Sequence, residues 1–310
     1  MKTRIKSLDT LKGIAALFII WIHEQFPGTT GQLIDRIGMF AVPVFFMVSG
    51  FFARTSSREK LTNSIRHTLL LLGLTYVLNI LRIIVFQGFA AALKSVVEAL
   101  SLRSLILLGA LNISPISGVA WFLFALLYCY ILHWIFHKYV QNQRIFLLIP
   151  LCFTVGFAVR CLLPSIGDHN AWFMGIPYYL CGQWFCENRE KIERTPLPYF
   201  VILAWIGFSV LVFSLFVFDP IFYIGHIFLS IPLFALCIHF PNWHNPLLAR
   251  IGSTYNYFVY VGHALMIHIF NAILPGGDSM LLAWVRPVLL AAATFGCAAL
   301  WYDVIRRKKV

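Results

Sequence analysis

Charged residues are scarce in this sequence. They make up only 12% of its 310 residues, whereas hydrophobic residues make up 60%. A soluble globular domain carries about 25% charged residues. A well-packed soluble core would not cover this much apolar surface, so the composition excludes an ordinary soluble domain. We therefore expect most of the chain to lie in lipid. The 9 Trp and 12 Tyr agree with this reading, because both side chains are enriched where a bilayer meets water.

Signatures of metal, disulfide and nucleotide chemistry are also missing. The 7 cysteines form no CxxC pair and mostly lie inside apolar runs, so we interpret them as small buried side chains. The sequence has no HExxH motif, no P-loop and no nucleophile elbow. We therefore expect no metal site and no permanently bound cofactor.

The net charge of +12 would suit a nucleic-acid partner. However, no basic amphipathic stretch or recognition motif accompanies it, so we expect no nucleic acid to bind. Cytoplasmic loops of membrane proteins collect Lys and Arg, and this tendency accounts for the excess.

Apolar runs long enough to cross a bilayer, about 20 residues each, recur along the sequence. They predict an all-α, polytopic membrane protein with about ten transmembrane helices in one membrane-embedded domain over residues 1–310. The predicted spans are 8–25, 36–53, 67–87, 118–137, 145–163, 171–186, 197–217, 220–240, 254–274 and 282–303. The first span follows a basic start but has no small-residue cleavage site, so we expect it to stay attached. Leu102–Leu111 is too short to span, and we expect a re-entrant or surface helix there.

The distribution of basic residues predicts the orientation. With the N-terminus and C-terminus in the cytoplasm, the outer loops carry Arg36, Lys94 and Arg103 and little else. The inner segments then carry most of the Lys and Arg, as the positive-inside rule requires, and this holds only for an even number of spans. These inner residues are Lys2, Arg4, Lys6, Arg54, Arg58, Lys60, Arg66, Lys138, Arg144, Arg189, Lys191, Arg194, Arg250 and the tail 306–309.

The first predicted helix carries polar residues at membrane depth, where they usually mark a function. Lys12 and His23 are 11 residues apart, so they lie within about 20° of each other on one helix face, about 16 Å apart along the axis. Asp9 lies within roughly 60° of the same face. Histidine is the side chain best suited to accept and return a proton near neutral pH. This stripe must face a hydrated cavity or other protein.

Structural explanations compete with the functional ones. Lys12 can snorkel to the cytoplasmic surface, and His23 with Glu24 can be an interfacial pair at the outer end. Ser49-Gly50 can be a small-residue contact between helices. In the ninth predicted span, Asn256, Tyr260 and His263 share a face and can form a helix-helix contact. Further intramembrane candidates are Arg82, Arg160, Asp219, His226 and Arg286.

Several of these segments together resemble the acyltransferase-3 family of bacterial membrane O-acyltransferases. The first helix of that family looks like LDxxRGxAxxxVxxxH, and the chain reads LDTLKGIAALFIIWIH from Leu8 to His23. The second helix of the family carries FFxxSGF, which matches Phe45–Phe51. The run from Trp121 to Leu123 resembles the WFL segment of the family, and 175–183 resembles its glycine-rich sixth span. The late SxxxYxxH helix resembles 252–263, with slightly altered spacing. The resemblance thus covers nearly the whole chain.

Two positions depart from the family pattern. Lys12 stands where the family usually has Arg, and Leu69 stands at the second arginine place of a basic stretch that here keeps Arg66. Lys cannot make the bidentate phosphate contact that Arg makes, so the departures bear on donor affinity and donor identity.

The resemblance implies that an acyl group, usually acetyl, passes from acetyl-CoA in the cytoplasm to a hydroxyl of a cell-surface carbohydrate. The expected co-substrate is therefore acetyl-CoA, and the expected partners are acyl-CoA, a carbohydrate acceptor and the lipid bilayer. The expected location is the bacterial inner or plasma membrane. His23 would be the catalytic residue, and Lys12 and Arg66 would bind the donor. Supporting or acceptor-binding roles fall to Asp9, Glu24, Ser49, Trp121, Tyr260 and His263.

Two other classes of protein stay open at this point. A transporter or flippase for a lipid-linked glycan could use Lys12 and His23 to line a proton-coupled path, although the sequence lacks internal repeats and Pro/Gly-broken helix pairs. A membrane sensor without chemistry would not need the charged stripe. Hydrolysis of acetyl-CoA, or incorporation of acetyl groups, by purified protein separates the enzyme from both.

Overall fold

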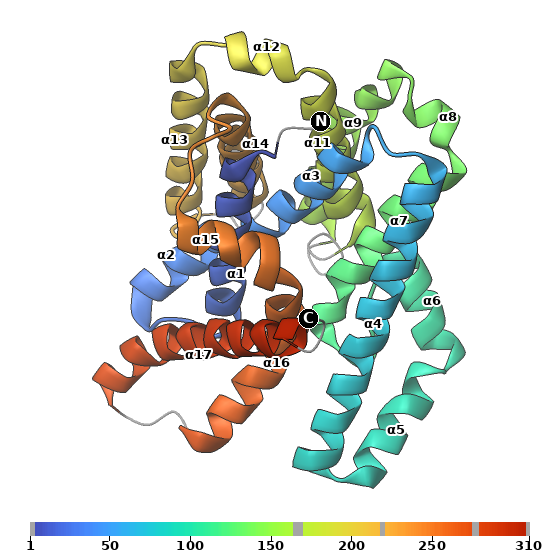
Figure 1. Ribbon diagram of the computed structural model, residues 1–310, viewed down its shortest axis with the longest axis vertical. Coiled ribbons are helices and arrows are strands. Elements are labelled where there is room, and N and C mark those ends of the chain that lie inside the picture. The colour runs from blue at the N-terminus through green and yellow to red at the C-terminus, as the bar shows by residue number, and fades with distance from the viewer. Residues whose placement is uncertain (1–3, 164–169, 218–220, 275–278, 308–310) are drawn as a thin grey trace. The chain divides into compact units, whose positions relative to one another are not determined.

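The computed structural model describes residues 4–163, 170–217, 221–274 and 279–307, with side chains up to Val304. Every regular element in these residues is a helix, as the apolar composition predicts (Figure 1). The chain forms two compact units. Unit 1 comprises residues 1–45 and 189–310, and unit 2 comprises residues 46–188.

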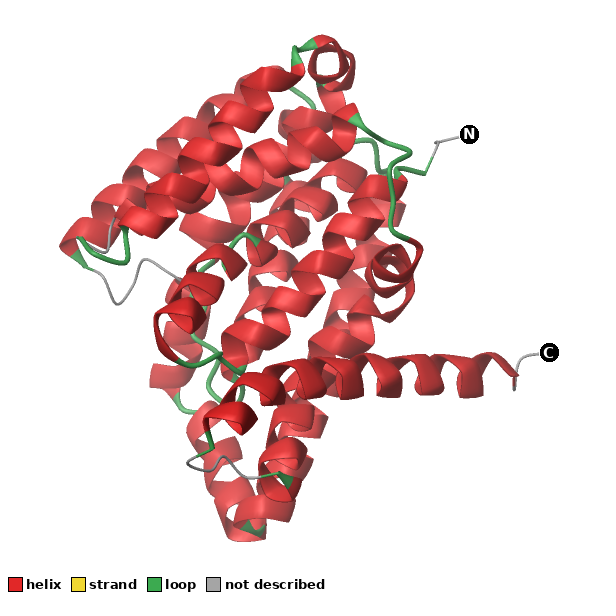
Figure 2. Cartoon of the chain, turned by 90° about the vertical axis from the view of Figure 1, so that its left-hand side faces the viewer, coloured by secondary structure: helices red, strands yellow, loops and turns green. Residues whose placement is uncertain are grey.

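Unit 1 contains both ends of the chain. Its longest helix, α17, is the helix that ends beside the label C in Figure 2. The helices α13 and α14 lie side by side along their length in Figure 1. The elements of unit 1 are α1 (Lys6–His23), α2 (Gly28–Gly38), α12 (Arg189–Arg194), α13 (Leu197–Phe213), α14 (Ile221–His239), α15 (Pro246–Arg250), the π-helix η4 (Ile251–Tyr255), α16 (Asn256–Ile273) and α17 (Met280–Arg307).

Unit 2 contains the middle of the chain, and α3 begins in unit 1 and continues into it. In Figure 1, α4 is the long helix of this unit, and α7 packs along it. The elements are α3 (Ala41–Ala53), α4 (Arg58–Gln87), α5 (Phe89–Ala99), α6 (Leu102–Leu111), η1 (Gly118–Ala120), α7 (Trp121–Ile135), α8 (His137–Val140), η2 (Gln143–Leu147), α9 (Leu148–Leu162), the π-helix η3 (Ala171–Gly175) and α11 (Ile176–Glu187).

Each predicted span falls on a helix, but the helices differ in their ability to cross a bilayer. Six helical segments of the described residues are long and apolar enough to do so. They are Gly28–Ala53, Arg58–Gln87, Gly118–Ile135, Gln143–Leu162, Ile221–His239 and Met280–Val304. The helices α1, α11, α13 and α16 are more polar or shorter, so the count of ten spans and the cytoplasmic termini stay predictions. Leu102–Leu111 forms a helix of 10 residues, and its membrane position stays a prediction too.

The second predicted span, 36–53, corresponds to two helices instead of one. α2 begins earlier, at Gly28, and a turn at Met39 and Phe40 separates it from α3. Pro43 lies in the first turn of α3, where its missing N–H is not needed by the helix. The apolar pattern alone does not reveal this turn, because both sides of it are hydrophobic.

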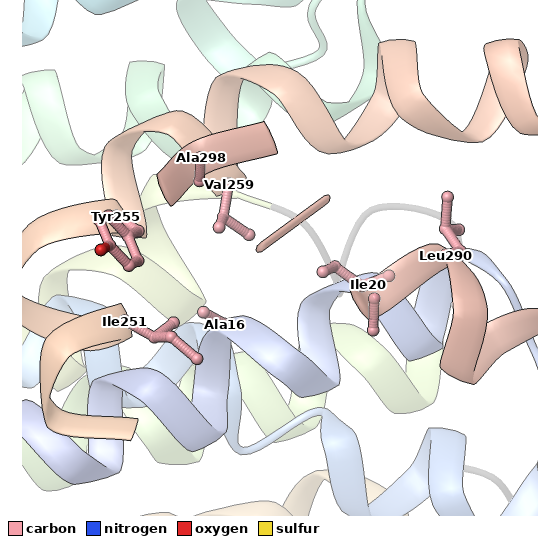
Figure 3. Packing of buried hydrophobic residues seen from close by; sticks show 8 residues of the cluster. Ala16, Ile20, Ile251, Tyr255, Val259, Leu290 and Ala298 are labelled. Carbon is pink, nitrogen blue, oxygen red and sulfur yellow. The ribbon is translucent and has the colours of Figure 1, made fainter. Parts of the chain in front are cut away.

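The core of unit 1 lies between α1, η4, α16 and α17 (Figure 3). Ile20 of α1 is fully buried, and Val259 of α16 and Leu290 of α17 are buried in the same cluster. Ile251 and Tyr255 of η4 join it, and Figure 3 shows Ala16 beside Ile251. Full burial of one such side chain stabilises a fold by about 1.5–3 kcal/mol, so this cluster fixes the helix that carries the polar stripe against two later helices.

Unit 2 is held by close helix contacts and by one buried ion pair. A Cβ on Gly50 of α3 would lie 1.9 Å from the Tyr179 carbonyl oxygen, and a Cβ on Gly182 would lie 1.9 Å from the Met47 carbonyl oxygen. The backbones of α3 and α11 therefore touch, which agrees with the packing interpretation of Ser49-Gly50. At the end of α3, buried Arg54 forms an ion pair with Glu187 and also donates to the Val140 carbonyl.

Candidate active site

The first half of α1 presents a compact charged group. The Asp9 carboxylate lies 2.9 Å from the Lys12 Nζ atom and 2.6 Å from the Arg4 Nε atom. The Lys12 side chain is only 15% exposed, so its ammonium points at Asp9 instead of reaching freely for water. Two cations around one carboxylate leave net positive charge here, which suits an anionic ligand.

Asp9 cannot also orient the imidazole of His23. The two residues are 14 positions apart on one continuous helix, which separates them by about 21 Å along its axis. Its supporting role is therefore limited to Lys12 and Arg4, which it contacts directly.

Glycines bring α1 against α15 and η4 at the level of Lys12. A Cβ on Gly13 would lie 2.0 Å from the Leu248 carbonyl oxygen, and a Cβ on Gly252 would lie 2.0 Å from the Asp9 carbonyl oxygen. Only a residue without a side chain permits either approach. The π-helical turn η4 thus packs on α1 backbone to backbone and holds the segment that carries Asp9 and Lys12.

The last turn of α1 brings two histidines together. The rings of His23 and His263 stack with centroids 5.1 Å apart and planes inclined by 29°. His263 is 1% exposed, whereas His23 is exposed. The pair therefore combines an accessible imidazole from α1 with a buried one from α16, which the sequence separates by 240 residues.

The tautomer of His263 follows from its contacts. Its Nδ1 atom lies 3.0 Å from the Val259 carbonyl oxygen and 2.8 Å from the Tyr260 carbonyl oxygen. Carbonyl oxygens only accept, so Nδ1 carries the proton and donates to them. In the neutral ring Nε2 then holds a lone pair, and this buried atom has no hydrogen-bond partner among the described residues. His263 is thus a buried ring, held by two backbone contacts, that stacks on His23. The Tyr260 ring lies 6.2 Å from the His263 ring.

Glu24 forms an ion pair with Arg286, which the sequence indicates only as a further intramembrane candidate. Its Oε1 atom lies 3.0 Å from the Arg286 Nε atom of α17, and the two side chains are 15% and 13% exposed. The ion pair ties α17 to the end of α1 directly beside His23. The signal for this residue in the sequence is an arginine within an apolar run, but its partner could be found only in three dimensions.

The remaining predicted site residues belong to unit 2. Arg66 is exposed on α4, and Ser49 is partly buried on α3 beside Gly50. The backbone carbonyl of Trp121, at the start of α7, accepts a hydrogen bond of 2.7 Å from Asn112, and the Trp121 ring lies 6.4 Å from Phe46. The roles of these three residues stay predictions.

The other polar candidates come from segments other than α1 and α16, which carry the histidine pair. His226 of α14 is buried between the rings of Phe222 and Tyr223, at 5.4 and 5.0 Å. Arg82 and Arg160 belong to unit 2, and Asp219 lies outside the described residues. Among the described residues no group of His, Cys, Asp and Glu could hold a metal ion.

A comparison with protein families gives one match, which covers residues 5–302 and is described as an acyltransferase domain. The chain belongs to the acyltransferase-3 family. The match includes α1, α16 and nearly all of α17. The positions of Lys12, His23, His263 and Arg286 therefore all lie within the matched residues. Neither the comparison with curated proteins nor that with solved structures finds a match. With its apolar helices, the protein is a multi-pass membrane acyltransferase.

Proposed function

We propose that the protein is an O-acyltransferase of the bacterial cell membrane. It moves an acyl group, which we expect to be acetyl, from cytoplasmic acyl-CoA to a hydroxyl of a cell-surface or lipid-linked carbohydrate. Membership in the acyltransferase-3 family supports acyl transfer. The single observation that carries the chemistry is the stack of the exposed His23 on the buried His263.

His23 acts as the general base in this proposal. Its imidazole takes the proton of the acceptor hydroxyl while the oxygen attacks the thioester carbonyl of the donor. The carbon–sulfur bond then breaks, and the CoA thiolate leaves with the proton that the imidazolium returns. The products are the ester and free CoA. In the alternative route the imidazole first takes the acyl group, and the alcohol then attacks the acyl-imidazole.

His263 acts as a positioning residue for His23. A cationic His263 would repel the imidazolium that forms on His23 during the reaction. A neutral His263, with Nδ1–H bound to backbone carbonyls, avoids this repulsion and offers an apolar ring face that restricts the rotation of His23. The burial of His263 and the exposure of His23 therefore support the choice of His23, and not His263, as the group that gains the proton.

The donor needs cations for its phosphates, and Lys12 and Arg66 are the proposed contacts. The distance from Lys12 to His23 along α1 is about 16 Å. A pantetheine-like arm can cover this distance, so phosphate binding near Lys12 is compatible with a thioester at His23. Tyr260 lies beside His263 and is proposed to contact the acceptor, as are Ser49 and Trp121.

The proposal is tested with purified protein in lipid nanodiscs. Radiolabelled acetyl-CoA is added, and release of free CoA is measured with and without extracted envelope glycans. We expect CoA release to rise with glycan and label to enter an alkali-labile ester. A protein that releases no CoA and esterifies no glycan, but moves glycan across a vesicle membrane, would instead be the transporter. Envelope glycans from cells with and without the protein identify the acceptor by the ester that disappears.

A further inference from the structure

Behind the face of α1 that carries Lys12 lies an apolar groove. It has a volume of about 440 Å³ and lies between α1 and the last turns of α14. Its lining includes Leu11 and Ile14 of α1, Leu236 of α14, and Phe240 and Trp243 just after α14. None of its lining residues is charged.

The groove and the polar stripe occupy opposite faces of α1. Successive residues turn by about 100°, so Ser7, Leu11 and Ile14 lie within about 60° of one another. Lys12 and His23 lie about 130–150° away from the centre of that group. Whatever fills the groove therefore supports α1 from behind, without touching the candidate active site.

The groove has few polar groups that could bind water. Ser7, its most polar lining residue, donates its hydroxyl to the Cys237 carbonyl oxygen at 2.6 Å, and the Cys237 thiol approaches the Ser7 carbonyl oxygen at 3.7 Å. An ordered water needs two to four polar partners, so an apolar space of this size favours hydrocarbon. A methylene occupies roughly as much space as a water molecule, so about 15 chain carbons would fit.

The surroundings of the groove select one kind of hydrocarbon. The exposed Trp243 and Phe240 follow a helix that can cross a membrane, and Trp is typical of the bilayer interface. Lys6 is exposed next to Ser7, at the same end of α1. A cation near an apolar groove matches a chain attached to an anionic head group.

We propose that this groove binds one acyl chain of an anionic phospholipid, whose phosphate contacts Lys6. The bound chain packs against Leu11 and Ile14 and holds α1 in place from the side opposite Lys12. The inference depends on the membrane setting and on the groove, and it does not depend on the acyl-transfer chemistry.

The test uses native mass spectrometry of the full chain after reconstitution in phosphatidylcholine nanodiscs containing phosphatidylglycerol. The wild type should retain one phosphatidylglycerol after release from the disc. Leu236→Trp fills the groove with an indole and should reduce this occupancy at least fivefold. Leu300→Trp, which adds the same indole at an exposed site of α17, should retain the lipid. If Leu236→Trp does not fold, Ile14→Phe serves as a smaller obstruction.

The charge contribution is tested separately with Lys6→Gln. One Lys near an anionic surface changes binding by about fivefold. In Lys6→Gln, the ratio of retained phosphatidylglycerol to retained phosphatidylcholine should therefore fall by about fivefold. Equal lipid retention by the wild type and both groove variants would overturn the proposal. Displacement of the lipid by acetyl-CoA would also overturn it, because the groove would then belong to the donor. A protein inactive in acyl transfer that still retains the lipid would separate this inference from the proposed function.

Discussion

At the residue scale, His23→Ala gives the sharpest test of the chemistry. Loss of a general base typically lowers the rate by about 10²–10⁴-fold, and we expect a loss in this range with the protein still folded. His23 is exposed, so its removal leaves no cavity in the core. Turnover and detergent-state melting are measured on the same preparation. Normal turnover per folded His23→Ala molecule would remove His23 from the reaction.

His263→Ala is the matched companion. The buried ring packs against His23 and donates to two carbonyls, so its removal should lower the melting temperature as well as activity. We expect a smaller loss of turnover than for His23→Ala, because the base itself remains. A larger loss at unchanged stability would exchange the roles of the two histidines.

Lys12 tests the donor site. Lys12→Ala should raise the KM for acyl-CoA, whereas Lys12→Arg should be tolerated or lower it, because Arg keeps the charge and offers more donors to a phosphate. Arg66→Ala should also weaken donor use. Lys60→Ala, an exposed cation on α4, is the control. Unchanged donor affinity in Lys12→Ala would leave the lysine with only its structural contact to Asp9.

The sequence predicts the helix of α1 and the spacing of residues along it, but not the partners of those residues. Helical spacing alone places Lys12, His23 and Asp9 on one face, because all three belong to one element. The stack on His263 and the contact of Glu24 with Arg286 join residues from distant helices. No periodicity within a single helix contains such information.

At the element scale, the contact between α1 and α15 makes a prediction about stability. A Cβ on Gly13 would collide with the Leu248 backbone, which cannot yield as a flexible side chain would. We expect Gly13→Ala to destabilise the protein by about 1–3 kcal/mol or more and to lower activity through displacement of Lys12. Gly296→Ala in α17 is the control, since a Cβ there meets nothing within 4 Å. Equal melting temperatures for the two variants would contradict the close contact.

The ion pair between α1 and α17 makes a second prediction at this scale. Glu24→Arg and Arg286→Glu should each lower activity, because each places two like charges in a mostly buried position beside His23. The double exchange should restore part of it, with a coupling of about 0.5–3 kcal/mol in a double-mutant cycle. Additive losses in the double variant would show that the two side chains act independently.

The sequence also predicts some features of the helices and misses others. The apolar runs place a helix under each predicted span, since burial in lipid requires a helical backbone. The π-helical turns at Ala171–Gly175 and Ile251–Tyr255 were not expected, and neither was the turn at Met39 and Phe40. These irregularities depend on tight contacts such as that of Gly252 with Asp9, and hydrophobicity does not encode them.

At the scale of the whole molecule, the direction of insertion follows from charge. Basic residues gather at one end of the predicted spans, so single cysteines near Lys60, Asn142 and Lys191 should react only with reagents that reach the cytoplasm. A cysteine near Thr30 should react from outside. All four positions are exposed, so a lack of labelling reports their side of the membrane and not burial. Pro275, also expected outside, lies outside the described residues.

Lys191 tests whether α11 crosses the bilayer. It lies in α12, between α11 and α13, which are among the helices that do not meet the length and polarity expected of a span. If both helices cross the bilayer, as ten spans require, Lys191 is cytoplasmic. If α1 crosses but neither α11 nor α13 does, the chain does not change sides between α9 and α14, and Lys191 shares the side of the α9 C-terminus, which is then outside. The parent chain with its 7 native cysteines gives the background for the labelling. Labelling of Lys191→Cys by a membrane-impermeant maleimide in intact cells would overturn the ten-span arrangement, and labelling only after permeabilisation would support it.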